Sequence, residues 1–213
     1  MANAIRQVER AEIPAGGKAE SVLAAAKRAF LAAGFGAVSM DTIAREAGVS
    51  KATVYAHFGS KEELFGAVIE RECERYFARF SVEELDPRDV RTSLKVLGRR
   101  YLELVLSLDG IALHRIMTGE VARFPALGEI FWRAGPERQR VQIESFLRSA
   151  AACGTLEFAD ARSAAEQFLS LARGEIQLRQ LLLLAPEAGP NEISVAVGSA
   201  VDTFVRAFQR EPG

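Results

Sequence analysis

The segment GVSKATVYAHFGSKEEL, residues 48–64, carries side chains that can contact nucleic acid. A serine N-cap at Ser50 and a break at Gly59 frame a short helix, and isolated helices of that length are marginal in water. Lysine can donate to guanine or phosphate, alanine and threonine methyls can touch thymine, and tyrosine and histidine can donate to phosphate oxygens. These residue types fill the short helix: Lys51, Ala52, Thr53, Tyr55 and His57. The stretch therefore has the side chains of a helix that recognises DNA.

The residues before this helix predict a second helix joined to it by a tight turn. Ser39 is placed to cap a helix that Gly48 ends, with Asp41 in the first turn, where the helix dipole favours a negative charge. A short glycine-containing turn between two helices is typical of a helix-turn-helix, whose second helix lies in the major groove. This short polar helix would then contact DNA on one side, while Val54 and Phe58 on its other side face the core of the head.

Helical spacing continues along the rest of the chain. A first helix starts at Lys18 and stops at Gly34, and a capping box at Ser60 opens a long helix that runs to about Phe80. Beyond it, apolar residues recur at helical steps, and no segment shows the alternation of a strand bounded by hairpin turns. We therefore predict an all-α fold, with an N-terminal three-helix head that contains the helix-turn-helix and a larger C-terminal helical body.

The stretch AFLAAGFGAVSMDTIAREAGVSKATVYAHFGSKEELF, within residues 18–65, resembles the DNA-binding head of the TetR family of transcriptional regulators. The run G-V-S-x-x-T-x-Y-x-H-F-x-S-K-E-x-L is more specific than a general helix-turn-helix. The segment RIMTGEVARFPALGEIFWRAGP is similar to the AefR-like subgroup of C-terminal domains of that family. The resemblance implies that the following residues contact DNA: Ser39 and Thr42 near the backbone, Ser50, Lys51, Ala52, Thr53, Tyr55 and His57 at the recognition helix, and Lys61 at a phosphate.

The same resemblance divides the chain into a flexible N-terminal arm (residues 1–17), a DNA-binding domain (18–65) and an effector-binding and dimerisation domain (66–213). It implies a homodimeric cytoplasmic regulator, a repressor that a small hydrophobic or amphiphilic effector releases from a pseudo-palindromic DNA operator. Two alternatives stay open. One is a TetR-type activator, and the other is a helical dimeric ligand-binding or scaffolding protein without sequence-specific DNA binding.

Aromatic, methionine and histidine side chains of the body are candidates for the wall of an effector cavity between helices. Residues of these types at helical spacing also form ordinary cores, so both interpretations stay open. The candidates for effector contact are Tyr101, His114, Met117, Phe124, Phe131 and Trp132.

The last two helical segments, residues 161–184 and 191–209, each carry a wide apolar stripe. Paired with their symmetry copies, they would form an isologous four-helix bundle, and the alternative is burial within one protomer. The predicted interface residues are Phe168, Leu171, Leu178, Leu182, Val197, Val201, Phe204 and Phe208. In such a dimer, two recognition helices about 34–36 Å apart read a pseudo-palindrome.

Composition and motifs argue against other classes. The net charge is −1, but residues 16–61 hold six basic and three acidic side chains, so a basic head precedes an acidic body, as in a module that binds a polyanion. The two cysteines lie far apart, so we expect no disulfide framework, metal site or cofactor. With two histidines and no G-x-S-x-G or H-E-x-x-H motif, an enzyme is not expected. No apolar run of 18 residues predicts a membrane span.

Overall fold

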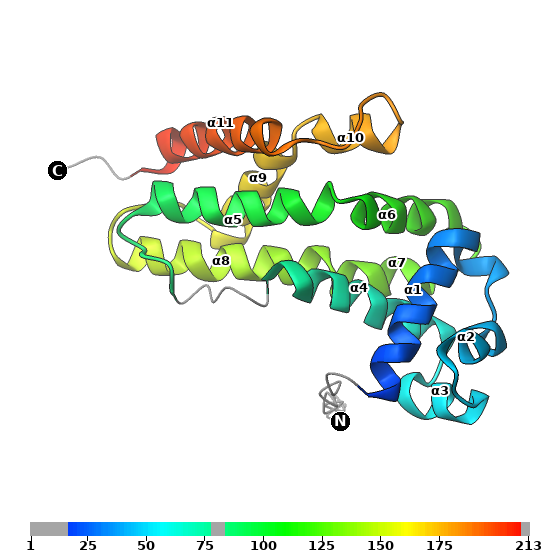
Figure 1. The fold of residues 1–213 in the computed structure, drawn as a ribbon. Coiled ribbons are helices and arrows are strands. Elements are labelled where there is room, and N and C mark those ends of the chain that lie inside the picture. Colours follow the sequence, from blue (N-terminus) through cyan, green and yellow to red (C-terminus); the bar gives the residue numbers. More distant parts are fainter. Residues whose placement is uncertain (1–16, 78–83, 210–213) are drawn as a thin grey trace.

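The computed structural model describes residues 17–77 and 84–209, and the regular structure of these residues is helical (Figure 1). The head comprises α1 (Lys18–Ala37), α2 (Met40–Ala47), α3 (Lys51–Phe58) and the start of α4 (Lys61–Phe77). The body continues with α5 (Val90–Val105), α6 (Leu108–Glu120), α7 (Ala126–Ala134), α8 (Pro136–Ala152), α9 (Ala161–Arg173), α10 (Ile176–Leu181) and α11 (Pro190–Phe208). Within the described ranges there is no strand, only an isolated bridge between Leu156 and Gln209. The predicted all-α class is confirmed.

Serine caps start α2 and α3, as the sequence predicts. The hydroxyl of Ser39 accepts a hydrogen bond from the backbone N–H of Thr42 at 3.1 Å, and the hydroxyl of Ser50 accepts one from the N–H of Thr53 at 3.1 Å. Gly48 ends α2 with a φ of +69°, in the left-handed region that residues with a Cβ avoid. The predicted helix-turn-helix is therefore confirmed.

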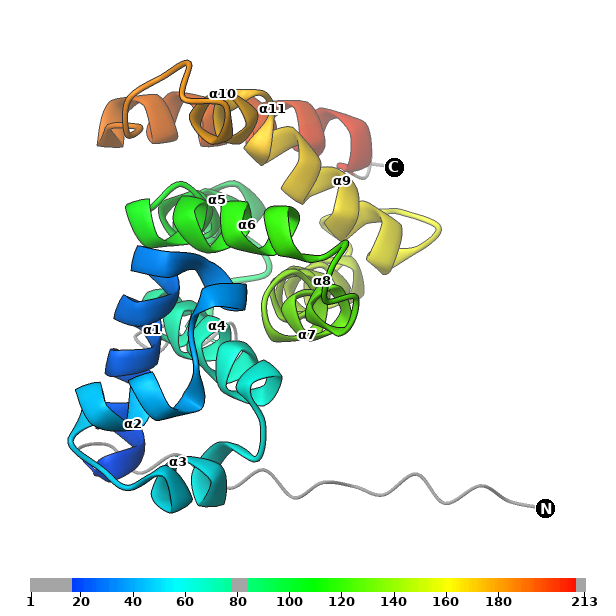
Figure 2. The same ribbon diagram turned by 90° about the vertical axis from the view of Figure 1, so that its right-hand side faces the viewer.

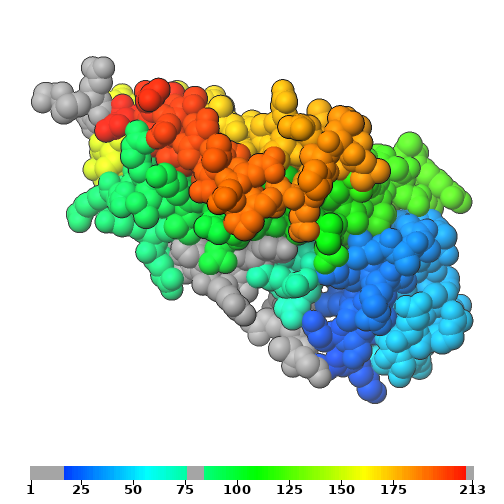
Figure 3. Space-filling view, turned by 45° about the horizontal axis from the view of Figure 1, so that its top comes forward, coloured from blue at the N-terminus to red at the C-terminus, as the bar shows by residue number. Residues whose placement is uncertain are grey.

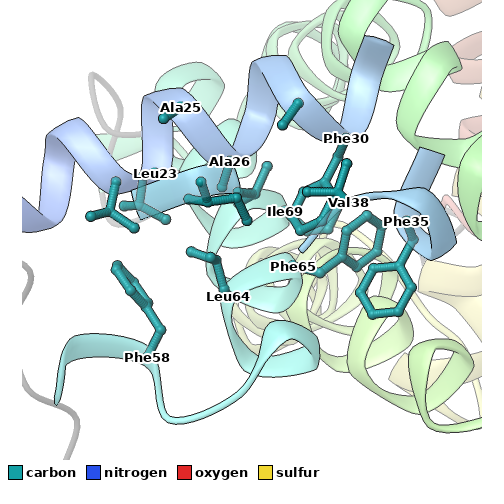
Figure 4. Close-up of a cluster of buried hydrophobic side chains, with 14 of the residues drawn as sticks. Leu23, Ala25, Ala26, Phe30, Phe35, Val38, Phe58, Leu64, Phe65 and Ile69 are labelled. Carbon is teal, nitrogen blue, oxygen red and sulfur yellow. The ribbon is translucent and has the colours of Figure 1, made fainter. Parts of the chain in front are cut away.

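The end of α1 differs from the prediction in one respect. Gly34, expected to stop the helix, has a φ of +79°, and after this kink the chain continues to Ala37. The kink directs Phe35 into the core, where its ring stacks on that of Phe30 with centroids 5.7 Å apart. The ring of Phe65 meets these two rings edge to face at 5.5 and 5.4 Å (Figure 4). This cluster of three phenylalanines holds α1 against α4.

The recognition helix α3 is anchored by Val54 and Phe58, which are buried as predicted. Figure 4 shows Phe58 pointing toward Leu23 of α1. The core that receives them is not confined to the head, because it also contains buried residues of α5, α6 and α7: Leu104, Leu113, Leu127 and Ala134. Head and body therefore share one hydrophobic core.

A second core lies among α5, α8, α9 and α11. In Figures 1 and 2, α5 lies between α8 and α11, and α9 crosses from α8 to α11. The fully buried rings of Phe168 on α9 and Phe204 on α11 meet edge to face at 5.4 Å. This core fixes the last long helix on the body.

Four residues predicted at the dimer interface belong to that second core instead. Their side chains are already buried within one protomer, so a partner has no surface of theirs to cover: Phe168, Val197, Val201 and Phe204. The apolar stripe of α11 faces α5 and α9 of the same protomer. The periodicity of the sequence alone does not distinguish this arrangement from a stripe that faces a second protomer. Phe208 is half-buried against the same core, whereas Leu171, Leu178 and Leu182 are exposed.

Two predictions fall outside the described residues. The predicted N-terminal arm lies there except for Gly17, and so does the extension of the fourth helix from Phe77 to Phe80. In the ranges that are described, no helix is both long and apolar enough to cross a membrane.

Replacing Gly48 tests the turn between α2 and α3. Gly48→Ala should lower the free energy of unfolding by about 1 kcal/mol, because the added Cβ meets no atom within 4 Å but the left-handed backbone is strained. Gly119→Ala is the matched control, since its Cβ also meets nothing within 4 Å and its place inside α6 favours alanine. Urea denaturation measures both. An equal effect of the two substitutions would contradict the assigned turn geometry.

Candidate DNA-binding surface and body cavity

The two sides of α3 differ in the way a groove-binding helix requires. Val54 and Phe58 are buried, whereas Lys51, Ala52 and His57 are exposed and Tyr55 keeps 44% of its surface accessible. Thr53 is half-buried next to its capping serine. The structure thus leaves four of the predicted DNA-contacting side chains of α3 exposed: Lys51, Ala52, Tyr55 and His57.

Lys51 has a partner of its own on this face. Its ammonium donates to a carboxylate oxygen of Asp41 on α2 at 3.0 Å, and both side chains are exposed. That hydrogen bond and the charge of Asp41 raise the pKa of Lys51. Lys51 is therefore fully charged. In a complex, a DNA phosphate or a guanine would replace the carboxylate of Asp41 as its hydrogen-bond acceptor.

The hydroxyls predicted to lie near DNA form pairs at two helix starts. Ser39 and Thr42 lie 3.0 Å apart, oxygen to oxygen, and Ser50 and Thr53 lie 2.8 Å apart. Each pair lies at a helix N-terminus, where the free N–H groups and the dipole favour an anion. Their first role is to cap α2 and α3, and in each pair one hydroxyl still has a lone pair or proton to offer a phosphate.

Lys61 is held more tightly than the sequence suggests. Its ammonium donates to the carbonyl oxygens of Phe35 and Val38, both at 2.9 Å, and lies 4.2 Å from the centre of the Phe35 ring. Burial lowers the pKa of Lys61. Two of its three donors thus satisfy the carbonyls left free at the end of α1, and one donor remains for the predicted phosphate contact.

A cavity of about 240 Å³ lies in the body and is lined by residues of helices α4 to α10. Four of the predicted effector residues line it: Tyr101, His114, Phe131 and Trp132. The rings of His114 and Phe131 meet edge to face at 5.8 Å. Burial, together with the positive charge of Arg173, lowers the pKa of His114, so its imidazole is uncharged at neutral pH. This wall suits a flat apolar ligand.

The other two predicted effector residues do not line this cavity. Met117 is half-buried elsewhere on α6. Phe124 packs its ring edge to face on Phe35 at 5.1 Å, and beside it the N–H of Gly36 donates to the carboxylate of Glu120 at 2.9 Å. Phe124 therefore joins the α6–α7 connection to the end of α1, a role that its aromatic type could not distinguish from a cavity wall.

Polar side chains complete the cavity, and sequence analysis did not identify them. They come from α4, α8, α9 and α10: Glu72, Cys73, Gln139, Arg140, Arg173 and Gln177. Burial raises the pKa of the Cys73 thiol to about 11, so the thiol is a neutral part of the wall. In a helical sequence, charged residues are normally expected to be solvent-exposed, and the spacing of these residues does not indicate that they line a cavity.

One of these side chains links the cavity to the head. Glu72 on α4 is buried, and its carboxylate accepts from Lys27 of α1 at 2.9 Å and from Arg75 at 3.0 Å. Lys27 also pairs with Asp109 of α6 at 2.5 Å. Although partial burial opposes its charge, the hydrogen bonds to Asp109 and Glu72 raise the pKa of Lys27. Charged contacts thus tie α1, α4 and α6 together next to the cavity.

Comparison with known families agrees with both parts of the molecule. Residues 22–68 match the model of the bacterial regulatory proteins of the tetR family, and residues 92–210 match that of the AefR-like transcriptional repressor, C-terminal domain. The chain belongs to the TetR family. It is therefore a DNA-binding regulator with a helix-turn-helix, a non-enzymatic class.

Solved structures of TetR regulators superpose on nearly the whole chain. The flavonoid-responsive regulator FrrA is 39% identical, with a TM-score of 0.75, over 93% of this chain and 100% of that one. A TetR-family regulator from Pseudomonas syringae is 27% identical, with a TM-score of 0.70 over 93% of this chain and 100% of its own. A putative regulator from Mesorhizobium loti, 23% identical with a TM-score of 0.75, shares the fold.

Curated TetR-type relatives match over shorter segments. The transcriptional activator FasR of Mycolicibacterium smegmatis is 47% identical over 53 residues, which are 25% of this chain and 24% of FasR. The regulator UidR of Escherichia coli K12 is 42% identical over 98 residues, which are 42% of this chain and 50% of UidR. The chain thus spans half or less of these relatives.

Proposed function

We propose that this TetR-family protein is a homodimeric repressor that a small aromatic effector releases from a pseudo-palindromic operator. The observation that carries the proposal is a cavity with an aromatic wall that lies against α4 and α6, the helices that share a core and charged contacts with the head. The match of the body to an AefR-like repressor domain supports repression.

At the operator, α3 enters the major groove with Lys51 and Ala52 at base edges and with Tyr55 and His57 at the phosphates. The exposed face of α3 supports these roles, as does the position of Lys51 in its first turn. Ser39 and Thr42 at the start of α2, Ser50 and Thr53 at the start of α3, and the remaining donor of Lys61 complete the phosphate contacts.

The effector is a small, flat, aromatic molecule that is hydrophobic or amphiphilic. Phe131, Trp132 and His114 offer ring faces and edges, while Tyr101 offers a phenol whose pKa burial raises, so it stays a neutral donor. The similar regulator FrrA is described as flavonoid-responsive, and flavonoids are planar aromatic compounds. Both observations point to the same ligand shape.

The dimer forms through the exposed apolar side chains of α9 to α11. Leu171, Leu178 and Leu182, which are predicted interface residues, are exposed, and Leu183, Leu184 and Val195 add further exposed apolar surface. Figure 3 shows the α10 region and α11 covering one face of the molecule. Several exposed large apolar side chains on neighbouring helices are typical of an interface, and two-fold pairing supplies the second head.

Lys51 and the operator test the DNA-binding part of the proposal. Selection from a random duplex pool should yield a palindrome with half-sites about one helical turn apart, bound with a steep negative salt dependence. Lys51→Ala should change the preferred base at one position of each half-site, at about 1–3 kcal/mol.

Lys95→Ala, at an exposed residue of α5, is the control and should leave affinity and preference unchanged. A uniform loss on all sequences with Lys51→Ala would show that Lys51 contacts phosphate and not a base. Failure to enrich any sequence would instead favour the non-DNA alternative.

Leu182 tests the dimer. Leu182 is 58% exposed on the proposed interface, and Leu182→Asp should convert the dimer to a monomer, because a partner would have to bury the carboxylate. Val141→Asp, at an exposed apolar residue of α8, is the matched control and should stay dimeric. Sedimentation velocity measures both. A dimer that survives Leu182→Asp but not Val141→Asp would place the interface on α8.

A further inference from the structure

One residue of the cavity wall has a buried donor without an acceptor. Arg140 of α8 lines the cavity, and its side chain is only 8% exposed. Its terminal nitrogens face carboxylates, since Nη1 donates to Glu144 and Nη2 lies 3.7 Å from Glu137. Its Nε is buried and has no hydrogen-bond partner. A buried donor without a partner destabilises the structure, and an acceptor on a ligand would satisfy it.

A second guanidinium adds positive potential to the same cavity. Arg173, at the end of α9, lines it as well and is exposed. Its charge reaches two aromatic groups of the wall, because it favours the deprotonated forms of both Tyr101 and His114. The carboxylates of the wall do not offset it, since Glu72 pairs with Lys27 and Arg75, and Glu166 pairs with Arg162.

From this geometry we infer that the effector carries an anionic oxygen, a carboxylate or an acidic phenolate, which accepts from Nε of Arg140 in the positive field of Arg173. The inference rests on the proposed effector cavity and adds the ligand's charge to its shape. The aromatic residues Phe131 and Trp132 contact the ring system of the ligand. Because His114 and Tyr101 are neutral, the two arginines are the groups that interact with the charge of the ligand. The ligand class is thus an aromatic acid.

A matched pair of probes tests the charge without DNA. Naphthalene-2-carboxylate and naphthalene-2-carboxamide have nearly the same shape, but only the first is an anion at neutral pH. Calorimetric titration of the full-length protein should show the carboxylate binding about tenfold more tightly than the amide. Equal affinities, or binding of neither compound, would overturn the inference.

Three variants assign the preference to residues. Arg140→Gln should remove the preference, and Arg173→Gln should reduce it severalfold. Arg206→Gln, on the exposed side of α11, should leave it intact. Arg140→Gln removes a buried partner of Glu144. If the variant does not fold for that reason, Arg173→Gln, at an exposed residue, still tests the inference. A preference that survives in every folded variant of the two arginines would overturn the assignment.

Operator binding, measured in parallel, separates this inference from the proposed function. Equal binding of both probes by a protein that still binds its operator contradicts only the ligand's charge. Binding of neither probe contradicts the effector cavity as well. If the unmodified protein binds no operator, this result contradicts the proposed regulator, whether or not the probes bind.

Discussion

The structure depends on the burial of Val54 and Phe58, because an eight-residue helix does not persist in water by itself. Ser50 caps α3, and Val54 and Phe58 pack in the same hydrophobic core as Leu23 of α1 and Leu64 of α4. With its apolar side occupied in this way, α3 can leave its polar side to DNA. The position of α3 therefore depends on the packing of the core in which Val54 and Phe58 are buried.

That core extends into the body, and this gives the cavity a physical route to the recognition helix. Residues of α5, α6 and α7 belong to the same cluster as Phe58, and Ile69 and Cys73 of α4 both pack in this core and line the cavity. Four polar or aromatic contacts reinforce the connection: Lys27 with Glu72, Lys27 with Asp109, Gly36 with Glu120, and Phe35 with Phe124. Close-packed interiors transmit strain, so a ligand that moves α4 relative to α6 acts on the head. It changes DNA binding only if it prefers one of the two arrangements.

Local signals in the sequence predicted the elements well. Ser39, Gly48 and Ser50 are short-range determinants, since each acts on backbone groups within a few residues, and the structure has the caps and turn that they predict. Tertiary choices were not predictable in the same way. The apolar stripe of α11 could face a partner or its own protomer, and the structure buries Val197, Val201 and Phe204 inside the protomer.

Long-range contacts account for the remaining differences at the site. Lys61 reaches carbonyls more than twenty residues earlier in the chain, at the end of α1 just after the kink at Gly34. Arg140 and Arg173 lie on different helices, α8 and α9, and both line the cavity. Neither has a sequence spacing that distinguishes a cavity arginine from a solvated one.

Thermodynamic linkage between operator and cavity tests the central claim most directly. A compound that binds the cavity should weaken operator affinity by a fixed factor, within about 5–150-fold, and the operator should weaken that compound's affinity by the same factor. Calorimetric titration of the compound with and without operator, and operator titration with and without saturating compound, measure the two factors. Equal factors well above one are the predicted result. Operator affinity that is unchanged when the cavity is saturated would contradict the account.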